Sequence, residues 1–247
     1  MNISFKNLIN EPVSVLMPVC NEADVIGSVI DEWLKDVFQY LPEGSEFIFD
    51  DGASTDGTLD IINNYSKKYN YIKVYKEKRD GFGKAAKRLY GRANCPFIFF
   101  TDSDGQYVAK DFWILAKYIN DYDFIRGGKV GRKDPIMRRL VSFIFNKLVL
   151  ILFDVYYFDV NSAFFLLKKS TLDKILPDLN DLSTLVNTEL LIRAVYSNYE
   201  VKQVYITHRE RKGGVSRGLP PLKVPFHGLK AFLGLLKIKA NYRDREL

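Results

Sequence analysis

Short apolar runs alternate with polar loops and amphipathic stretches along the first hundred residues of the chain. Runs of this length that end at turn residues are typical of buried strands. They span Val13 to Val19, Phe47 to Phe49, Tyr71 to Tyr75 and Phe97 to Phe100. Helical spacing predicts helices from Asp24 to Val37, from Leu59 onward and from Lys84 to Ala93. The alternation predicts right-handed crossovers and a mostly parallel sheet, an α/β fold whose ligands bind at the carboxyl edge of the strands.

The second half of the chain is less regular. The stretch from Arg138 to Phe153 is strongly apolar but interrupted by Asn146 and Lys147, which predicts a helix in the core or on a membrane surface. The remaining predicted elements are a strand over Phe158 to Leu167, a helix over Thr188 to Tyr196, a strand over Val201 to Thr207 and an amphipathic stretch over Phe226 to Ala240.

The composition is that of a folded globular protein, since 47% of the 247 residues are hydrophobic and 27% are charged. The longest run without a charged residue, Pro12 to Asn21, is shorter than the ~20 apolar residues of a membrane-spanning helix. We therefore expect no transmembrane helix, and with no apolar segment after Met1 we expect no secretory signal and a cytosolic protein. Cys20 and Cys95 cannot form a disulfide framework or a four-ligand zinc site.

Positive charge is concentrated at the end of the chain. The net charge is +6, but the segment from Lys202 to Leu247 alone carries +8 and the rest carries −2. Such a segment indicates an anionic partner: a phosphorylated substrate, an anionic lipid surface or a nucleic acid.

Acidic residues follow three of the four predicted strands in the first half. They are Glu22 after the first, Asp50 and Asp51 after the second, and Asp102 and Asp104 after the fourth. Two acids spaced i, i+2 in a loop can turn both carboxylates toward Mg²⁺ or Mn²⁺, with Gln106 as a further oxygen ligand. One such pair alone is as well explained by a turn or a helix cap. Polar signatures in successive loops at one sheet edge favour a binding site.

Four segments resemble the successive signatures of family 2 glycosyltransferases with the GT-A fold. They are VLMPVCNE at 15–22, FDDGASTDGT at 49–58, GFGKAAKRLYGRA at 81–93 and TDSDGQ at 101–106. Later segments, DVNSAFFLLKK at 159–169 and HRERKGGVSR at 208–217, are similar to the branch that transfers a hexose from a nucleotide sugar to a polyprenyl phosphate, the dolichyl-phosphate-mannose-synthase-like enzymes. The resemblance implies a Rossmann-like, mostly parallel sheet flanked by helices, with C-terminal amphipathic helices at a membrane surface.

The same resemblance implies a domain plan. A GT-A domain would span residues 1–219, with a nucleotide-sugar half over 1–106 and an acceptor half over 107–219, and a basic amphipathic tail would span 220–247. This chain departs from the family in three places: Ala53 adds a residue between Gly52 and Ser54, and Lys129 and Phe165 stand where arginine is common.

Carried over by position, the family's motifs give a set of expected site residues. The donor, a UDP- or GDP-hexose, would contact Pro18, Asn21, Glu22, Asp50 or Asp51, Lys87 and Asp102. The cofactor, Mg²⁺ or Mn²⁺, would be held on the diphosphate by Asp102, Asp104 and Gln106. Asp104 and Asp159 would be the catalytic residues. The acceptor phosphate would meet Lys129, Arg138, Arg139, Arg211, Lys212, Ser216 and Arg217.

An acceptor phosphate changes the chemistry that is required. A phosphate monoester has a second pKa of about 6 and is ionised near pH 7, so orientation and charge neutralisation can suffice. A glycan hydroxyl as acceptor would instead need a carboxylate base such as Asp159. Both acceptors are compatible with the donor half, and the hydroxyl acceptor of polysaccharide synthesis is the alternative activity.

The final stretch supports the expectation of a protein attached peripherally to the cytosolic face of a membrane. On a helical wheel Lys230 and Lys237 share one stripe, and an apolar stripe contains Leu229, Phe232, Leu233 and Leu236. The same helix could instead pack on the core or against a second subunit, which would make a homo-oligomer.

A non-catalytic basic module is the alternative from another class. Aromatic residues lie mainly in apolar runs and do not alternate with Lys and Arg on a polar face, so we expect no nucleic-acid partner.

Overall fold

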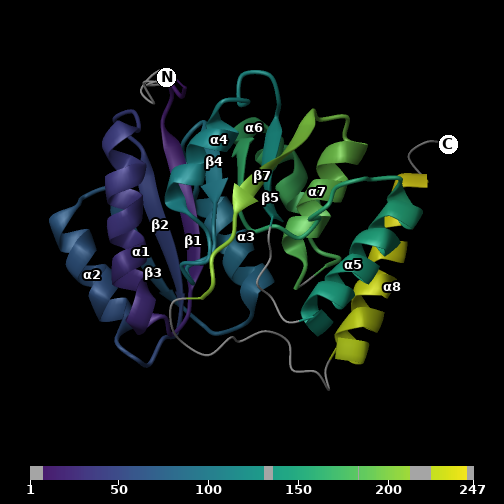
Figure 1. Ribbon diagram of the computed structural model, residues 1–247, viewed down its shortest axis with the longest axis horizontal. Helices are drawn as coiled ribbons and strands as arrows, with labels where there is room; N and C mark the ends of the chain where they lie inside the picture. The colour runs from purple at the N-terminus through teal and green to yellow at the C-terminus, as the bar shows by residue number, and fades with distance from the viewer. Residues whose placement is uncertain (1–7, 131–135, 183, 212–223, 244–247) are drawn as a thin grey trace.

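The computed structural model describes residues 8–130, 136–182, 184–211 and 224–243 (Figure 1). The strands are β1 (Val13–Val19), β2 (Glu46–Gly52), β3 (Ile72–Glu77), β4 (Phe97–Phe100), β5 (Phe124–Val130), β6 (Phe165–Lys168) and β7 (Val201–Thr207). The α-helices are α1 (Ala23–Asp36), α2 (Thr58–Lys68), α3 (Phe82–Arg92), α4 (Phe112–Ala116), α5 (Ile136–Phe153), α6 (Lys169–Ile175), α7 (Val186–Tyr196) and α8 (Val224–Arg243). Short 3₁₀ turns are η2 (Phe38–Tyr40), η3 (Ala109–Asp111) and η4 (Leu176–Asp178).

A seven-stranded sheet in the order β3-β2-β1-β4-β6-β5-β7 forms the middle layer. The first four strands in the chain are mutually parallel, and Leu16 of β1 lies opposite Ile48 of β2 and Phe100 of β4. Strand β6 runs antiparallel to both β4 and β5, whereas β5 and β7 are parallel. The predicted α/β fold with a mostly parallel sheet is confirmed.

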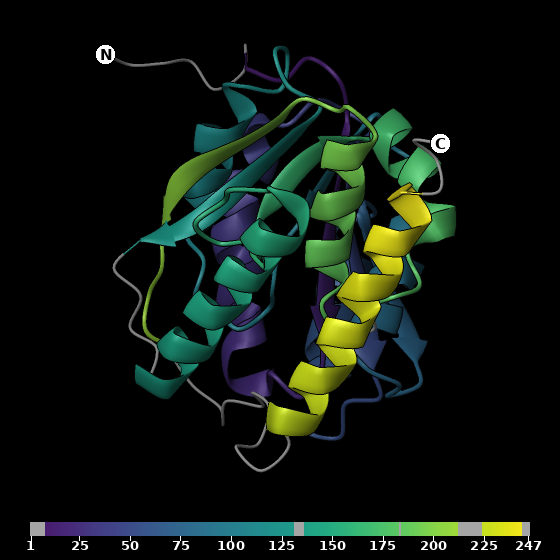
Figure 2. The same ribbon diagram turned by 90° about the vertical axis from the view of Figure 1, so that its right-hand side faces the viewer.

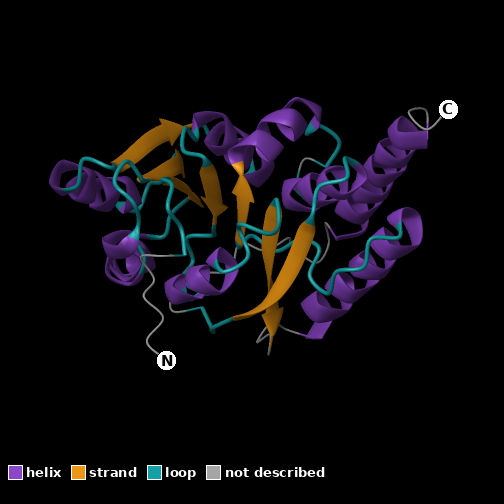
Figure 3. Ribbon diagram, turned by 90° about the horizontal axis from the view of Figure 1, so that it is seen from above, coloured by secondary structure: helices purple, strands orange, loops and turns teal. Residues whose placement is uncertain are grey.

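Helices cover both sides of the sheet, as the view from above in Figure 3 shows. Helix α1 packs beside α2, α3 packs on β1 and β2, and α6 packs beside α7. The apolar spacing that predicted α1 places Val25, Val29 and Trp33 in the core. The Trp33 ring lies 5.2 Å from Phe99 and 6.0 Å from Phe47 between ring centroids. Burial of each such side chain stabilises the fold by about 1.5–3 kcal/mol.

Two predicted boundaries were wrong. Strand β2 continues through Asp50, Asp51 and Gly52, because their backbones pair with β1 and β3. The strand expected over Phe158 to Leu167 is limited to β6, because the buried Arg126 guanidinium holds the preceding segment as a loop. It donates hydrogen bonds to the carbonyl oxygens of Val160 and Ser162 at 2.9 and 3.1 Å.

Three elements were missed. Strand β5 reads FIRGGKV, in which two glycines and two cations hide the apolar alternation. A Cβ on Gly128 would lie 2.1 Å from the Phe158 ring, so close packing requires glycine there. Helices α4 and α6, of five and seven residues, are too short to show a helical period.

Helices α5 and α8 lie side by side at one end of the molecule (Figure 2). Leu235 and Ile238 of α8 are buried, and Lys237 pairs with Asp181 at 2.6 Å, so one side of α8 packs on the rest of the chain. The predicted apolar stripe is on the other side, where Leu229 and Leu233 are exposed. Among the described residues, no helix has the length and apolarity needed to span a bilayer. The division at residue 219 stays a prediction.

Candidate functional site

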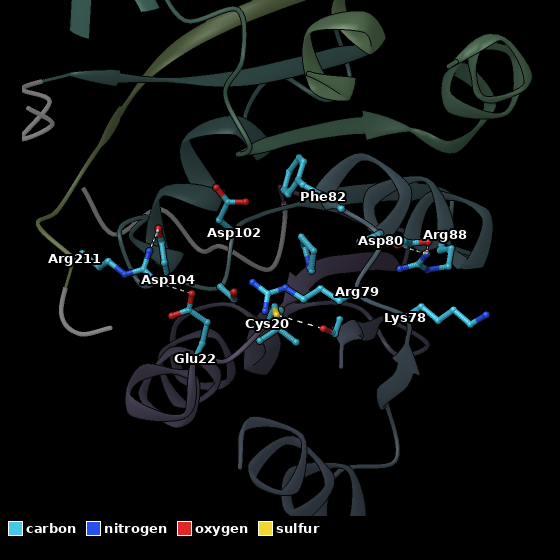
Figure 4. Close-up of a pocket in the computed structure, with 16 residues that line it drawn as sticks. Cys20, Glu22, Lys78, Arg79, Asp80, Phe82, Arg88, Asp102, Asp104 and Arg211 are labelled. Atoms are coloured by element: carbon cyan, nitrogen blue, oxygen red, sulfur yellow. Dashed lines mark hydrogen bonds and ion pairs between the residues drawn. The ribbon is translucent and has the colours of Figure 1, made fainter. Parts of the chain in front are cut away.

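A cavity of about 280 Å³ opens at the carboxyl ends of β1, β2 and β4 (Figure 4). Its walls come from the segments that follow four strands and from the segment after β7. The lining residues are Pro18, Val19, Cys20, Glu22, Gly52, Lys78, Arg79, Asp80, Gly81, Phe82, Ala85, Arg88, Asp102, Ser103, Asp104 and Arg211.

The β1–α1 loop is fixed by hydrogen bonds to the β2–α2 loop. The backbone N–H of Asn21 donates to Ser54 Oγ at 2.8 Å, and Asn21 Oδ1 accepts from the N–H of Thr55 at 2.7 Å. The N–H of Glu22 donates to Thr58 Oγ1 at 2.8 Å, while its carbonyl accepts the first hydrogen bonds of α1. These bonds leave the Glu22 carboxylate at the cavity, whereas Asn21 ties two loops together and is outside the cavity lining.

The loop after β4 brings two further carboxylates to the cavity. Asp102 and Asp104 both line it, which places them beside Glu22. Asp104 Oδ1 accepts a hydrogen bond from the N–H of Gln106 at 3.1 Å. Gly105 between them has φ +71°, a left-handed conformation that glycine adopts without strain. The local turn therefore keeps Asp104 at the sheet edge.

The segment after β7 crosses the same loop. The N–H of Arg209 donates to the carbonyl of Gln106 at 2.8 Å, and Gln106 Nε2 donates to the carbonyl of Arg209 at 3.2 Å. Arg209 also pairs with Glu32 of α1 at 2.6 Å. These contacts carry Arg211 to the cavity, where its guanidinium lies 2.5 Å from Glu22 Oε1 and 3.5 Å from Asp104 Oδ2.

The acids fit a divalent cation that is shared with a substrate. The described part of the chain contains no group of three or more His, Cys, Asp or Glu residues able to hold a metal by themselves. Mg²⁺ is usually held by one or two carboxylates, substrate phosphates and waters, which is the number that Asp102 and Asp104 can offer. Asp104 already pairs with one positive group, the Arg211 guanidinium.

Asp50 and Asp51 have different surroundings, and neither lines the cavity. Both oxygens of Asp50 accept hydrogen bonds from Arg88, at 2.8 and 3.0 Å. Burial raises the pKa of Asp50, against the hydrogen bonds from Arg88. Asp51 Oδ2 accepts from the N–H of Ser54, while its buried Oδ1 has no hydrogen-bond partner in the described residues. The extra residue Ala53 is absorbed in a tight turn at φ +53°.

Two expected ligands point elsewhere. Lys87 Nζ donates to Asn180 Oδ1 at 2.6 Å, because this face of α3 is turned toward the loop after η4 and away from the cavity. Gln106 lies outside the cavity lining, and its side-chain nitrogen is engaged by the segment after β7.

A second polar group lies at the end of β5. Lys129 Nζ is 3.7 Å from Asp159 Oδ2, and both side chains are largely buried. Lys129 Nζ also lies 5.7 Å from the centre of the Tyr107 ring. Burial raises the pKa of the Tyr107 phenol, on which the charges of Lys129, Asp102 and Asp159 also act. The structure therefore brings Lys129 and Asp159 together beside the Tyr107 ring.

The other expected acceptor residues are separate from this group. Arg139 is exposed near the start of α5 and does not line the cavity. Lys212, Ser216, Arg217 and the side chain of Arg138 lie outside the described residues.

The wall formed by the β3–α3 loop was not predicted from the sequence. Lys78, Arg79, Asp80 and Phe82 line the cavity, and so does Arg88 of α3. The signal available in the sequence was the charged run KEKRD at 76–80, which directly follows the predicted strand Tyr71 to Tyr75.

Solved structures share this fold. Glucosyl-3-phosphoglycerate synthase from Mycobacterium tuberculosis, crystallised with Mn²⁺, uridine diphosphate and phosphoglyceric acid, matches with a TM-score of 0.71 and 19% identity, over 93% of this chain and 79% of that chain. Mannosyl-3-phosphoglycerate synthase from Rubrobacter xylanophilus matches with a TM-score of 0.67 and 14% identity, over 96% of this chain and 77% of that chain. The expected GT-A fold is confirmed.

Sequence relatives act on several acceptors. The dolichyl-phosphate hexose transferase of Haloferax volcanii is 27% identical over 207 residues, which are 82% of this chain and 85% of that protein. The poly(ribitol-phosphate) beta-glucosyltransferase of Bacillus spizizenii is 36% identical over 95 residues, which are 37% of this chain and 14% of that protein. The cholesterol galactosyltransferase of Borreliella burgdorferi is 28% identical over 92 residues, 37% of this chain and 25% of that protein. The matched region thus spans a quarter or less of the length of each of the latter two proteins.

The family match includes most of the residues that line the cavity. Residues 14–176, more than half of the chain, match Glycosyl transferase family 2, and these residues include the β1–α1 loop, the β3–α3 loop and the loop after β4. The chain therefore belongs to glycosyl transferase family 2.

Proposed function

We propose that the protein transfers a hexose from UDP- or GDP-hexose to a polyprenyl phosphate, with inversion at the anomeric carbon. One observation carries this proposal: carboxylates from separate loops and the guanidinium groups of Arg79 and Arg211 line one cavity. Arginines bind phosphate through charge-assisted hydrogen bonds, and paired acids share a divalent cation with phosphate. A nucleotide diphosphate satisfies both requirements.

Asp102 and Asp104 are the residues that would hold Mg²⁺ or Mn²⁺ on the diphosphate. When bound, the cation would supply Lewis-acid stabilisation of the leaving diphosphate. Asp51 is a better candidate than Asp50 for a contact with the nucleotide, since Asp50 is saturated by Arg88 while Asp51 Oδ1 lacks a hydrogen-bond partner among the described residues.

The acceptor phosphate would meet Lys129 and Arg211. One of its oxygens forms the bond to the anomeric carbon while the bond from that carbon to the diphosphate oxygen breaks, and the nucleoside diphosphate leaves with the electron pair. The phosphate is already ionised near pH 7, so no side chain has to remove a proton. Asp159 then orients Lys129, 3.7 Å away. The similarity to the Haloferax volcanii transferase supports this acceptor class.

Transfer to a glycan hydroxyl is the alternative, and the similarity to the Bacillus spizizenii glucosyltransferase favours it. Asp159 would then act as general base, because an alcohol must lose its proton to attack.

An exposed apolar surface on α5 and α8 supports a lipid acceptor. Ile136, Met137 and Phe143 of α5 and Phe226 and Leu233 of α8 are between 56% and 80% exposed. Both helices begin at the end of the molecule where β1 and β2 end, as Figure 1 shows. An exposed apolar surface of this kind favours peripheral binding to the cytosolic face of a bilayer.

The test is a transfer assay. Purified protein is incubated with radiolabelled UDP- or GDP-hexoses, Mg²⁺ or Mn²⁺, and polyprenyl phosphate in vesicles. We expect label in the organic extract. Label in water-soluble oligosaccharide supplied as acceptor would support the alternative, and no transfer from any donor would contradict both.

A further inference from the structure

The guanidinium of Arg88 is shared between two carboxylates from different parts of the chain. Nε and Nη2 donate to the two oxygens of Asp50 on β2, at 2.8 and 3.0 Å. Nη1 donates to both oxygens of Asp80 in the β3–α3 loop, at 3.0 and 2.9 Å. The planar fork of arginine can bond two carboxylates in this way, whereas the point charge of lysine cannot.

The Asp50 side of this cluster is withdrawn from water. Asp50 is fully buried, and its Oδ2 also accepts from Arg92 Nη1 at 3.3 Å, while Arg92 Nη2 pairs with Glu77. Hydrogen bonds from Arg88 to Asp50 and Asp80 raise the pKa of the Arg88 guanidinium. Removing one member of a desolvated ion cluster leaves an uncompensated charge, so the cluster is costly to rearrange.

Asp80 belongs to the loop that forms one wall of the cavity. Arg79 and Asp80 are consecutive, and Figure 4 shows that their side chains take different directions: Arg79 extends toward Cys20, and Asp80 lies beside Arg88. The next residue, Gly81, has φ +105°, which lets the chain turn directly into α3. Fixing Asp80 therefore fixes the position from which Arg79 reaches the cavity.

We propose that Arg88 is a positioning residue, which locks the Lys78–Phe82 loop to β2 through Asp80 and Asp50 and so aims Arg79 at the anionic part of the donor. This inference rests on the proposed function for the identity of the ligand. The position of the loop does not depend on that identity. Arg88 acts through Asp80 and Arg79, so its loss weakens donor binding and changes the chemical step little.

The experiment compares R88K and D80N with D80E and with K73M. K73M breaks the 2.6 Å ion pair of Lys73 with the buried Glu46 at the opposite end of β2, far from the cavity. Dissociation constants for UDP and GDP with Mn²⁺, donor KM, kcat and amide hydrogen exchange of residues 78–82 are measured. We expect R88K and D80N to weaken nucleotide binding and raise donor KM about tenfold, with kcat within about threefold.

The expected pattern has four further parts. The double variant R88K/D80N binds nucleotide no more weakly than R88K, because both changes break one unit. D80E restores part of the affinity, and K73M keeps it while lowering thermal stability. Amides of residues 78–82 exchange faster in R88K than in the wild type with or without nucleotide.

Unchanged exchange in R88K, or nucleotide binding weakened no more than in K73M, would overturn the positioning role. If the wild type bound no nucleotide at all, the proposed function would fail. Faster exchange in R88K would still show that Arg88 holds the Lys78–Phe82 loop in position.

Discussion

The guanidinium of Arg211 lies 2.5 Å from the carboxylate of Glu22, which joins the segment after β7 to the β1–α1 loop. The same guanidinium lies 3.5 Å from Asp104. Arg211 thus puts a fixed positive charge between Glu22, an expected donor contact, and Asp104, a proposed ligand of the cation. A divalent cation that binds Asp104 before the nucleotide arrives must compete with this charge.

Replacing Arg211 with methionine should therefore tighten the binding of Mn²⁺ alone. We expect the dissociation constant for Mn²⁺, measured without nucleotide by electron paramagnetic resonance, to fall about three- to tenfold, the effect of removing a partly buried ion pair. K73M, which removes a cation outside the cavity, should leave it unchanged. Equal or weaker Mn²⁺ binding by R211M would show that the arginine does not compete with the metal.

Lys129 should matter for the acceptor and not for the donor. We expect K129M to lower kcat/KM for polyprenyl phosphate about 10- to 100-fold, since a charge-assisted hydrogen bond to phosphate is lost. Its dissociation constant for nucleotide should match that of the wild type. K202M removes a cation that lies 4.6 Å from the centre of the Tyr118 ring, away from Asp159, and should have normal kinetics. A donor-binding defect in K129M would contradict its assignment.

The exposed side of α8 gives a test of membrane binding. We expect L233D to reduce cosedimentation with anionic phospholipid vesicles about tenfold, because the apolar side chain that would be buried in the bilayer is lost. N241D adds the same charge to the same helix at the far end and should sediment normally. If both variants pellet like the wild type, α8 does not enter the bilayer interface.

Glu46 should make stability depend on pH. Burial alone would raise its pKa, but hydrogen bonds from Lys73 and Ser14 prevail and hold the pKa of Glu46 below its usual value. A lowered folded pKa means that the unfolded chain binds the proton more tightly, so this stabilisation is complete well above the unfolded pKa of about 4.3 and is lost as pH falls through the folded pKa. The urea midpoint of wild type should exceed that of E46Q by more at pH 7 than at pH 4. An equal difference at both pH values would exclude the linkage.

The repeating strand–helix pattern was predictable because apolar periodicity reports burial directly. Strands β1, β4 and β7 and helix α1 come from runs in which that signal is clear, and the residues of β1 are almost all buried. Strand β5 escaped notice because Gly127 and Gly128 serve close packing against Ile206 and Phe158, contacts that are distant in sequence.

Three carboxylates of the cavity and Arg211 were predictable, whereas Asp80 and the cations Lys78, Arg79 and Arg88 were not. Glu22, Asp102 and Asp104 follow strands, and parallel topology alone brings such residues to one edge. Arg88 lies on a helix beside Lys87, and sequence spacing does not say which of the two turns toward the sheet. The tertiary packing of α3 decides this.

The proposed donor site requires Asp104 to hold a divalent cation on the nucleotide diphosphate. Isothermal titration of UDP and GDP with and without Mn²⁺ tests it most directly, in the wild type, in D104N and in a D60N control on the exposed side of α2. We predict that Mn²⁺ strengthens binding of one nucleotide at least tenfold in wild type and D60N, and that this Mn²⁺ effect disappears in D104N. An equal Mn²⁺ effect in D104N would show that Asp104 does not hold the cation.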